Sequence, residues 1–242
     1  MRHLLVTGGG RGIGAAIVRR AVAAGDRVSF TYRSDDEAAR ALRSDLGDDV
    51  LPIRSDVSHD GDAGRVLSEA VEWSGPLHGL VNNAGITGRT STFVDLPIDQ
   101  VREVFDVNVV GLLAITQAVV RRWRRDATAG VVVNVSSIAA RLGGANEFIG
   151  YASSKAAVDA ITLGLGRELA PHGIRVVGIG AGTTRTDIHA EAGDPERPAR
   201  AAAGIPLGRI AEPDEIAATV LFALSPEASF ITAATIPVAG GL

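Results

Sequence analysis

The 242-residue sequence contains no cysteine, and aromatic residues make up only 4% of it. Without cysteine, disulfide bonds, thiolate metal sites and cysteine nucleophiles are all excluded. The five histidines are scattered and show no metal-ligand spacing, so we expect no metal site. A formal net charge of -4 argues against nucleic acid as a partner.

Membrane and export signals are missing as well. No apolar run approaches the ~18 residues of a membrane span, and the stretch His3–Thr7 is too short for the core of a signal peptide. We therefore expect a soluble, cytoplasmic protein with no membrane partner. Hydrophobic residues account for 46% of the chain, which is enough to bury a core.

Lysine is nearly absent. All of the 24 basic residues are arginine except Lys155. In such a background, a lysine marks either a place where arginine cannot substitute or a chance survival. Composition alone does not decide between the two.

Short apolar runs alternate with longer helical patterns along the chain. The runs are rich in Val, Ile and Leu, which is typical of parallel strands covered on both faces. The expected strands are His3–Thr7, Arg27–Tyr32, Val50–Arg54, Gly79–Asn82, Val131–Val135, Ile174–Ile179 and Ala234–Pro237. The expected helices are Gly12–Ala24, Asp35–Leu46, Asp62–Ser74, Ile98–Arg125, Tyr151–Ala170 and Glu212–Leu224. This order predicts an α/β, Rossmann-type doubly wound parallel sheet of about seven strands with helices on both faces.

No linker or repeat divides the chain, so we expect a single domain over residues 1–242. Ser34 and Glu37 have the spacing of a capping box at the start of a helix. The least regular part, Thr183–Pro206, is rich in Ala, Pro, Gly and charge. We expect it to form a substrate lid at about residues 183–206.

A glycine-rich turn follows the first expected strand. It reads Thr7-Gly8-Gly9-Gly10-Arg11-Gly12-Ile13-Gly14 and leads into a helical pattern. Glycines let the backbone approach a pyrophosphate closely, and the helix amino terminus offers free N–H groups. A glycine cluster can also be a plain turn. Its position between a strand and a helix favours nucleotide binding.

The end of the second strand indicates which nucleotide binds. An acid there usually holds the ribose hydroxyls of NAD, whereas arginine suits the 2′-phosphate of NADP. Here the strand is followed by Arg33 and Ser34, and Arg11 lies in the glycine turn. Two guanidinium groups can clamp one phosphate. The acids at 35–37 oppose this reading, although they also suit the first turn of a helix. We expect NADPH rather than NADH.

Four further motifs lie downstream. They are Asn82-Asn83-Ala84-Gly85, Asn108, Ser136-Ser137 and Tyr151-Ala152-Ser153-Ser154-Lys155. With the glycine turn, they resemble the short-chain dehydrogenase/reductase family along essentially the whole chain. Within that family the chain resembles the 3-oxoacyl-ACP reductases and glucose-dehydrogenase-like members.

The resemblance implies a catalytic group of Asn108, Ser137, Tyr151 and Lys155. The i to i+4 spacing places Tyr151 and Lys155 on one helix face, where an ammonium lowers the pKa of a tyrosine. Tyr151 would then exchange a proton with the substrate oxygen, which Ser137 would orient. In the family the lysine also holds the nicotinamide ribose, and the asparagine holds a water of a proton relay.

Alternatives to these roles stay open. Tyr151 and Lys155 would be an ordinary amphipathic pair if they stood alone. Ser136 is a rival for the serine role, but Ser137 lies nearer to the spacing usual in the family. Asn108 could merely interrupt a helix.

The resemblance also implies further cofactor contacts. Asp56 and Val57 match the residues that read the adenine, although Asp56 could be a turn carboxylate. The other implied contacts are Gly8, Gly10, Gly12, Ile13, Gly14, Asn83, Ala84, Gly85, Gly182, Thr184 and Thr186. The chain departs from the family after the sixth strand. Gly178 and Ala181 stand where the family commonly has Asn and Pro, which loosens the loop that meets the nicotinamide.

Partners are less well marked. The run Arg121-Arg122-Trp123-Arg124-Arg125 suits the carboxyl end of a helix, and a sharper reading is docking of an acyl carrier protein or coenzyme A. Small residues along Tyr151–Ala170 suit a homotetramer or homodimer, as is usual in the family. The substrate pocket should draw on Ile86–Val94, Ile138–Gly150 and the lid. With Phe93 and Phe148 as its only aromatics, it implies an uncharged carbonyl compound.

The function predicted from the sequence is NADPH-dependent reduction of a ketone, 3-oxoacyl or polyketide-type, to a secondary alcohol. One alternative is an alcohol or sugar dehydrogenase working in the oxidative direction. Another is a non-catalytic NADP-binding sensor, which should have lost Tyr151 and Lys155.

Overall fold

A computed structural model of the chain describes residues 1–59 and 61–242. All its strands join one parallel sheet in the order β3-β2-β1-β4-β5-β6-β7. The strands are β1 (His3–Val6), β2 (Arg27–Tyr32), β3 (Val50–Arg54), β4 (Gly79–Asn82), β5 (Val131–Ser137), β6 (Arg175–Ala181) and β7 (Ala234–Val238). The order reverses direction between β1 and β4, which is where ligands bind in doubly wound sheets.

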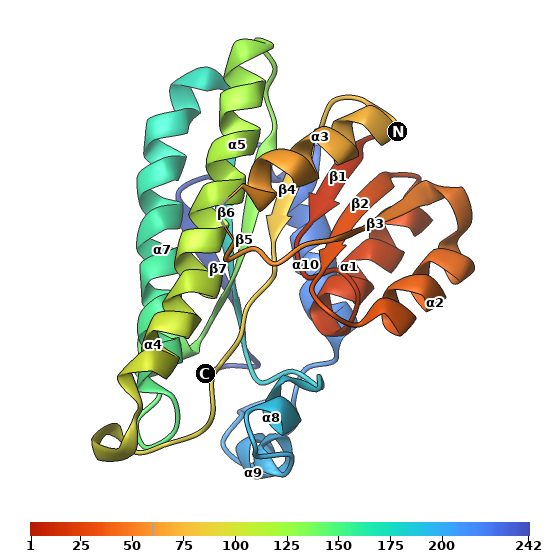
Figure 1. Cartoon of the computed structure of the whole chain (residues 1–242). Helices are drawn as coiled ribbons and strands as arrows, with labels where there is room; N and C mark the ends of the chain where they lie inside the picture. Colours follow the sequence, from red (N-terminus) through yellow and green to blue (C-terminus); the bar gives the residue numbers. More distant parts are fainter. Residues whose placement is uncertain (60) are drawn as a thin grey trace.

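Helices cover both faces of the sheet (Figure 1). The longer helices are α1 (Gly12–Ala23), α2 (Asp36–Leu46), α3 (Asp62–Ser74), α4 (Ile98–Phe105), α5 (Leu112–Arg125), α7 (Ile149–Leu169) and α10 (Pro213–Leu224). Short helices are α6 (Ala139–Leu142), α8 (Ile188–Glu191) and α9 (Arg197–Ala202), with 3₁₀ turns at Gly47–Asp49, Phe93–Asp95, Ala170–His172 and Pro226–Ala228. One core cluster packs α1, α2 and α10 on the sheet, and a second packs α3, α5 and the end of α7 on the other face.

Strands β5 and β6 run further than the apolar pattern predicts. Ser136 pairs with Gly180 and Ser137 with Ala181, so both strands continue past their last branched residues. The extension carries Ser137 to the carboxyl edge of the sheet.

The start of α2 differs from the expected capping box. The N-cap is Asp35, not Ser34, and its carboxylate accepts from the Ala38 N–H at 2.9 Å. The acids of this segment therefore serve the helix start.

The expected helix over Ile98–Arg125 is continuous but irregular. A π-helical turn, Asp106–Gly111, separates α4 from α5. By length and composition alone this helix could cross a membrane, since its most apolar window has a mean hydropathy of 1.6. In the fold it packs along α7, and 44% of that window is buried. The sequence-based expectation that no apolar run approaches the length of a membrane span was therefore wrong for this helix, whose length and composition both suffice.

Buried amides tie the sheet to this helical layer. The Asn82 side chain donates to Thr116 and to Asn134, each at 2.8 Å. Asn134 in turn donates to Thr162 of α7 at 2.9 Å. Since each link is buried, the network fixes α7 against β5.

The segment predicted as a lid contains α8 and α9. Figure 1 shows both short helices beyond the carboxyl edge of the sheet, apart from the two helical layers.

Candidate active site

A cavity of about 1440 Å³ opens at the carboxyl ends of the strands. All residues expected to contact the cofactor border it: Gly8, Gly10, Arg11, Gly12, Ile13, Gly14, Arg33, Ser34, Asp56, Val57, Asn83, Ala84, Gly85, Tyr151, Lys155, Gly182, Thr184 and Thr186. Ser137 borders it too. The fold thus brings together residues from the carboxyl ends of strands β1 to β6, from helix α7 and from the lid.

The glycine turn is built for close approach. Gly8 has a φ of +64°, and a Cβ on Gly14 would lie 2.1 Å from the Gly8 carbonyl oxygen. Thr7 joins this turn to the next strand end, because its hydroxyl oxygen accepts from the N–H groups of Asn83 and Ala84 at 3.0 and 3.1 Å. Because the turn consists of glycines, it leaves open a space that larger residues would fill, and this space fits a pyrophosphate at the start of α1.

Ser137 and Tyr151 face each other across the cavity wall. Ser137 ends β5, and Tyr151 lies in the first turn of α7, where the Ser137 hydroxyl is near enough to influence the pKa of its phenol. Burial raises the pKa of Tyr151, while the Ser137 hydroxyl and the positive charge of Arg197 oppose that rise. The pKa direction is therefore opposite to the one the Tyr–Lys spacing predicts, because desolvation of the phenol prevails.

The rival serine is differently engaged. Ser136 also borders the cavity, but it is only 2% exposed and its hydroxyl donates to the Lys155 carbonyl oxygen at 3.2 Å. Its bond holds strand β5 to helix α7.

Lys155 lies one turn after Tyr151 and is 5% exposed. Its ammonium donates to the Val135 carbonyl oxygen at 2.8 Å and lies 5.8 Å from the Tyr151 ring centroid. Burial lowers the pKa of Lys155 to about 8, partly offset by the charge of Asp159. A group with that pKa is mostly protonated at neutral pH yet holds its proton less firmly than an exposed lysine.

Asn108 lies behind the cavity in the π-helical turn. Its amide donates to the Ile86 carbonyl oxygen and to the Ser154 hydroxyl, and its carbonyl oxygen accepts from the Ile86 N–H, each at 2.9 Å. A Cβ on Gly85 would meet both the Asn108 oxygen and the Lys155 ammonium, at 3.2 and 3.5 Å. Asn108 therefore lies in the irregular turn of a continuous helix and at the same time adjoins Lys155 across Gly85. Turns of this kind frequently mark functional sites.

The two arginines expected to clamp a 2′-phosphate, Arg33 at the end of β2 and Arg11 in the glycine turn, are held differently. Arg33 is exposed and forms no ion pair with any described residue. Arg11 is paired with Glu191 of the lid. Two of the three opposing acids have other partners: Asp35 caps α2, and Asp36 lies 3.9 Å from Arg54.

Asp56 follows β3 and accepts from the N–H and the hydroxyl of Ser58 at 3.0 and 2.6 Å. Although burial opposes it, these bonds lower the pKa of Asp56. Its carboxylate is thus held as a turn residue at the cavity border.

Sequence reasoning missed the charged side chains of the substrate end. Arg197 of α9 donates to Glu147 at 2.9 and 3.1 Å and lies 4.5 Å over the Phe148 ring. The Phe148 and Tyr151 ring centroids are 6.0 Å apart. Buried His189 borders the same space, where burial and then Arg197 lower its pKa. The many charged residues of the lid segment were the sequence signal that could have predicted charged side chains at the substrate end.

The loop after β6 is held without the usual proline. Gly182 N–H donates to the Val238 carbonyl oxygen, and Ala211 N–H donates to the Thr183 carbonyl oxygen, each at 2.9 Å. The space beside Gly178 is filled by Thr235, whose oxygen would lie 2.4 Å from a Cβ there. These bonds to β7 and residue 211 give the loop a support that the altered motif did not predict.

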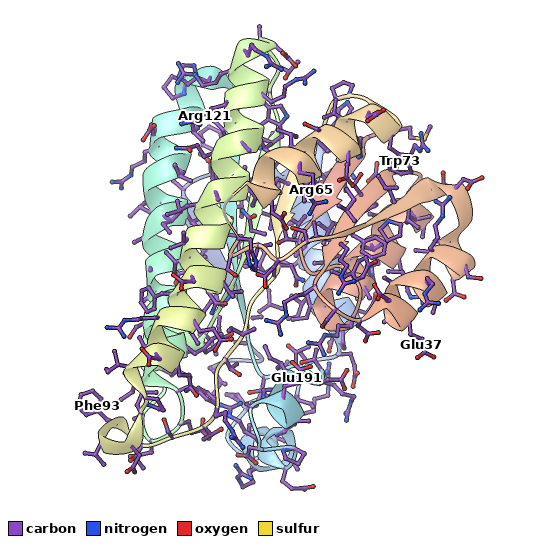
Figure 2. The ribbon with its side chains drawn as sticks, in the orientation of Figure 1. Glu37, Arg65, Trp73, Phe93, Arg121 and Glu191 are labelled. Atoms are coloured by element: carbon purple, nitrogen blue, oxygen red, sulfur yellow. The ribbon has the colours of Figure 1, made fainter. Side chains whose placement is uncertain are left out.

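The expectation that Phe93 lines the substrate pocket was wrong, and the arginine run lies at the end of a helix, as its first reading predicted. Phe93 is 71% exposed and does not border it, and Figure 2 shows this residue at the outer tip of its loop, away from Glu191. The arginine run ends α5 at the opposite end of the molecule, as the label of Arg121 in Figure 2 shows. Arg122 and Arg125 pair with Asp126, while Trp123 is buried.

Comparison with known proteins agrees with this architecture. A family model described as enoyl-(acyl carrier protein) reductase matches residues 8–242. An uncharacterized oxidoreductase of Escherichia coli, YgfF, is 35% identical over 100% of both chains, and acetoacetyl-CoA reductase of Shinella zoogloeoides is 37% identical over 99% of this chain and 98% of its own. A 3-ketoacyl-(acyl-carrier-protein) reductase of Brucella melitensis, solved with NADH, superposes with a TM-score of 0.92 at 28% identity, covering 99% of this chain and 97% of the other.

The doubly wound sheet and the shared cavity of glycine turn, serine, tyrosine and lysine define a nicotinamide-dependent oxidoreductase. The chain belongs to the short-chain dehydrogenase/reductase family. The family resemblance seen in the sequence is confirmed, as is the fold class.

Proposed function

We propose that this enzyme reduces a ketone to a secondary alcohol with NADPH, using Tyr151 as the general acid. The observation that carries the proposal is the joint placement of Tyr151, Ser137 and Lys155 on the cavity that also contains the glycine turn. Two of the similar proteins support a ketone substrate by their names: the Shinella protein is an acetoacetyl-CoA reductase, and the Brucella protein is a 3-ketoacyl-(acyl-carrier-protein) reductase.

In this mechanism each side chain has one task. The glycine turn and Lys155 would hold a nicotinamide cofactor in the cavity, and the bound cofactor would supply the hydride chemistry. Ser137 orients the carbonyl oxygen by a hydrogen bond. Tyr151 gives its phenolic proton to that oxygen, and its raised pKa keeps the proton in place until the oxygen becomes basic. Lys155, protonated at neutral pH, stabilises the phenolate left behind.

Support for NADPH comes from the end of β2. Arg33 forms no ion pair among the described residues, although its charge helps to lower the pKa of Asp56. Of the nearby acids, Asp35 caps α2 and Asp36 lies beside Arg54. An unpaired guanidinium at this position suits a 2′-phosphate. The Brucella neighbour was solved with NADH, so the choice rests on Arg33 and Arg11 of this chain.

A substrate screen that follows nicotinamide absorbance tests the proposal. We expect a higher kcat/KM with NADPH than with NADH, and turnover of free or carrier-bound 3-oxoacyl compounds. Replacing Tyr151 by Phe should reduce kcat by at least ~10²-fold, because general acid catalysis is worth that much. Undiminished turnover in this variant, or a strong NADH preference, would contradict the mechanism or the cofactor choice respectively.

The same residues also catalyse the reverse reaction, so the screen includes alcohols and sugars with NADP⁺. Faster oxidation of a sugar than reduction of any ketone would favour the dehydrogenase alternative. Turnover of neither class would favour an NADP-binding sensor.

Assembly and carrier docking are separate proposals. Along α7 the small residues Ser153, Ala156, Ala160 and Gly164 are exposed in a stripe. Val110 and Leu113 of the adjoining helix are 52% and 40% exposed. This apolar surface supports association of copies as a dimer or tetramer. Carrier docking has weaker support, since Asp126 neutralises two arginines of the run.

A further inference from the structure

The lid is joined to the glycine turn by an ion pair that no sequence motif predicts. Both carboxylate oxygens of Glu191 accept from the two terminal nitrogens of Arg11, one of them at 2.8 Å. The partners are 180 positions apart in the chain. Glu191 ends α8, and Figure 2 labels it where the lid meets the body of the molecule.

Packing beneath this pair keeps the lid against the turn. A Cβ on Gly12 would lie 3.1 Å from the Thr186 methyl, so the segment before α8 rests directly on the start of α1. Asp187 and Asp35 add negative charge, and together with Glu191 they raise the pKa of Arg11. The positive charge of Arg11 is thus compensated mainly by an acid that the lid carries.

This pairing conflicts with the phosphate clamp. Arg11 and Arg33 border the same cavity, Arg11 from the glycine turn after β1 and Arg33 from the end of β2, and the proposed function assigns both to the cofactor's 2′-phosphate. Glu191 already occupies both terminal nitrogens of Arg11, whereas Arg33 has no ion partner within residues 1–59 and 61–242. A bidentate guanidinium–carboxylate pair and a bidentate guanidinium–phosphate pair use the same donors. Arg11 therefore cannot hold both anions in full.

We propose that Glu191 determines cofactor specificity by competing with the 2′-phosphate for Arg11, so that NADPH, unlike NADH, releases α8 from the glycine turn. The inference rests on the proposed function, in which Arg11 and Arg33 take the phosphate. It makes Glu191 a specificity residue acting through Arg11, and it links cofactor type to the position of the lid.

Affinity measurements on Glu191→Gln test the competition. The amide keeps the size of the side chain and removes its charge. Since both partners are about half exposed, with side-chain exposures of 51% and 46%, we expect NADPH affinity to rise only about two- to fivefold. NADH affinity should stay unchanged. Glu196→Gln removes the same charge from an exposed lid position that forms no ion pair among the described residues, and it should change neither affinity.

The outcomes separate the inference from the function it rests on. If Glu191→Gln weakened the binding of NADPH and of NADH equally, the inference would be overturned, because the ion pair would then hold the lid over either cofactor. An unchanged affinity ratio would overturn it too. If Arg33→Gln fails to weaken NADPH binding while Glu191→Gln strengthens it, the two-arginine clamp fails and the competition stands.

Amide hydrogen exchange gives an independent readout of the lid. In the wild-type enzyme, α8 should exchange faster with saturating NADPH than with saturating NADH. In Glu191→Gln this difference should disappear. Identical exchange of α8 with both cofactors in the wild-type enzyme would contradict the release of the lid.

Discussion

A buried ammonium explains why one lysine persists among arginines. The Lys155 ammonium donates to the Val135 carbonyl oxygen, and a Cβ on the neighbouring Gly85 would crowd the Asn108 oxygen at 3.2 Å. A planar guanidinium needs more space and a different donor geometry. The sequence predicts the importance of this residue, whereas the cost of burying its charge is evident only from the fold.

Lys155→Arg should retain the charge but lower kcat/KM by about 10²-fold or more, because the Tyr151 phenolate loses its placed partner. Steady-state kinetics with a fixed ketone and both cofactors measures this. As a control, Arg167→Lys at the exposed far end of α7 should leave kinetics unchanged. An active Lys155→Arg enzyme would mean that the lone lysine is a coincidence.

Lys155→Met should stabilise the protein while removing activity. The pKa of Lys155 is about 8 in the folded chain against an ordinary 10.5, so the unfolded state binds more protons between these values. The free energy of unfolding of the wild type therefore rises with pH from about 8 to 10.5, and the full cost of the buried charge applies below pH 8.

Denaturant unfolding of both proteins from pH 7 to pH 10 checks this sign. At pH 7 the methionine variant should be more stable by about 1–3 kcal/mol, and its advantage should shrink as the pH rises. A constant difference across the range would show that packing, not charge, sets the stability.

Two short helices of the lid place charges over opposite ends of one cavity. Helix α8 brings an acid to Arg11, and α9 brings Arg197 to Glu147. The composition of this segment predicts that it is irregular. Which residues its charged side chains pair with depends on the paths of its loops, and no periodic sequence pattern encodes those paths. The π-helical turn at Asp106–Gly111 is similar in this respect, since Asn108 signals an interruption without indicating its form.

Arg197→Gln should raise the pKa of Tyr151, since the arginine's positive charge favours the phenolate. In the oxidative direction, the pH at which kcat/KM reaches half its maximum should therefore move upward. Lys155 of α7 keeps its charge in this variant, and His189 of α8 and Glu147 also face the space.

Glu147→Gln is the matched control, because it breaks the same ion pair but leaves the cation in place. It should not shift the profile upward. If both variants move the profile alike, displacement of the lid rather than the charge of Arg197 is responsible.

Across the whole molecule, the sheet and its order of elements follow from the sequence, because strand and helix patterns alternate without interruption. The cofactor residues were predictable for the same reason: parallel strands end at one edge, so motifs that follow them converge. The substrate end was not, since Phe93 points outward and charged lid residues line the space. For association of copies, the sequence offers only the stripe of small residues along α7 as an indication.

Ala160→Glu should disrupt association of copies, because it puts a charge in the middle of the exposed stripe on α7. Light scattering after size exclusion should show a smaller species, with unfolding cooperativity retained. Arg40→Glu, at an exposed site on α2, serves as the control and should keep the wild-type mass. A wild-type protein that is monomeric would refute the proposed interface.

The burial of Lys155 also makes the enzyme an unusual target for chemical labelling. Acylating reagents that attack lysine amines find only this side chain, and it lies on the wall of the cofactor cavity at 5% exposure. Its rate of acylation, followed separately from that of the exposed terminal amine of Met1, therefore reports how accessible the cofactor cavity is. Bound nucleotide should slow the reaction, and surface coupling through lysine would inactivate each molecule it captures.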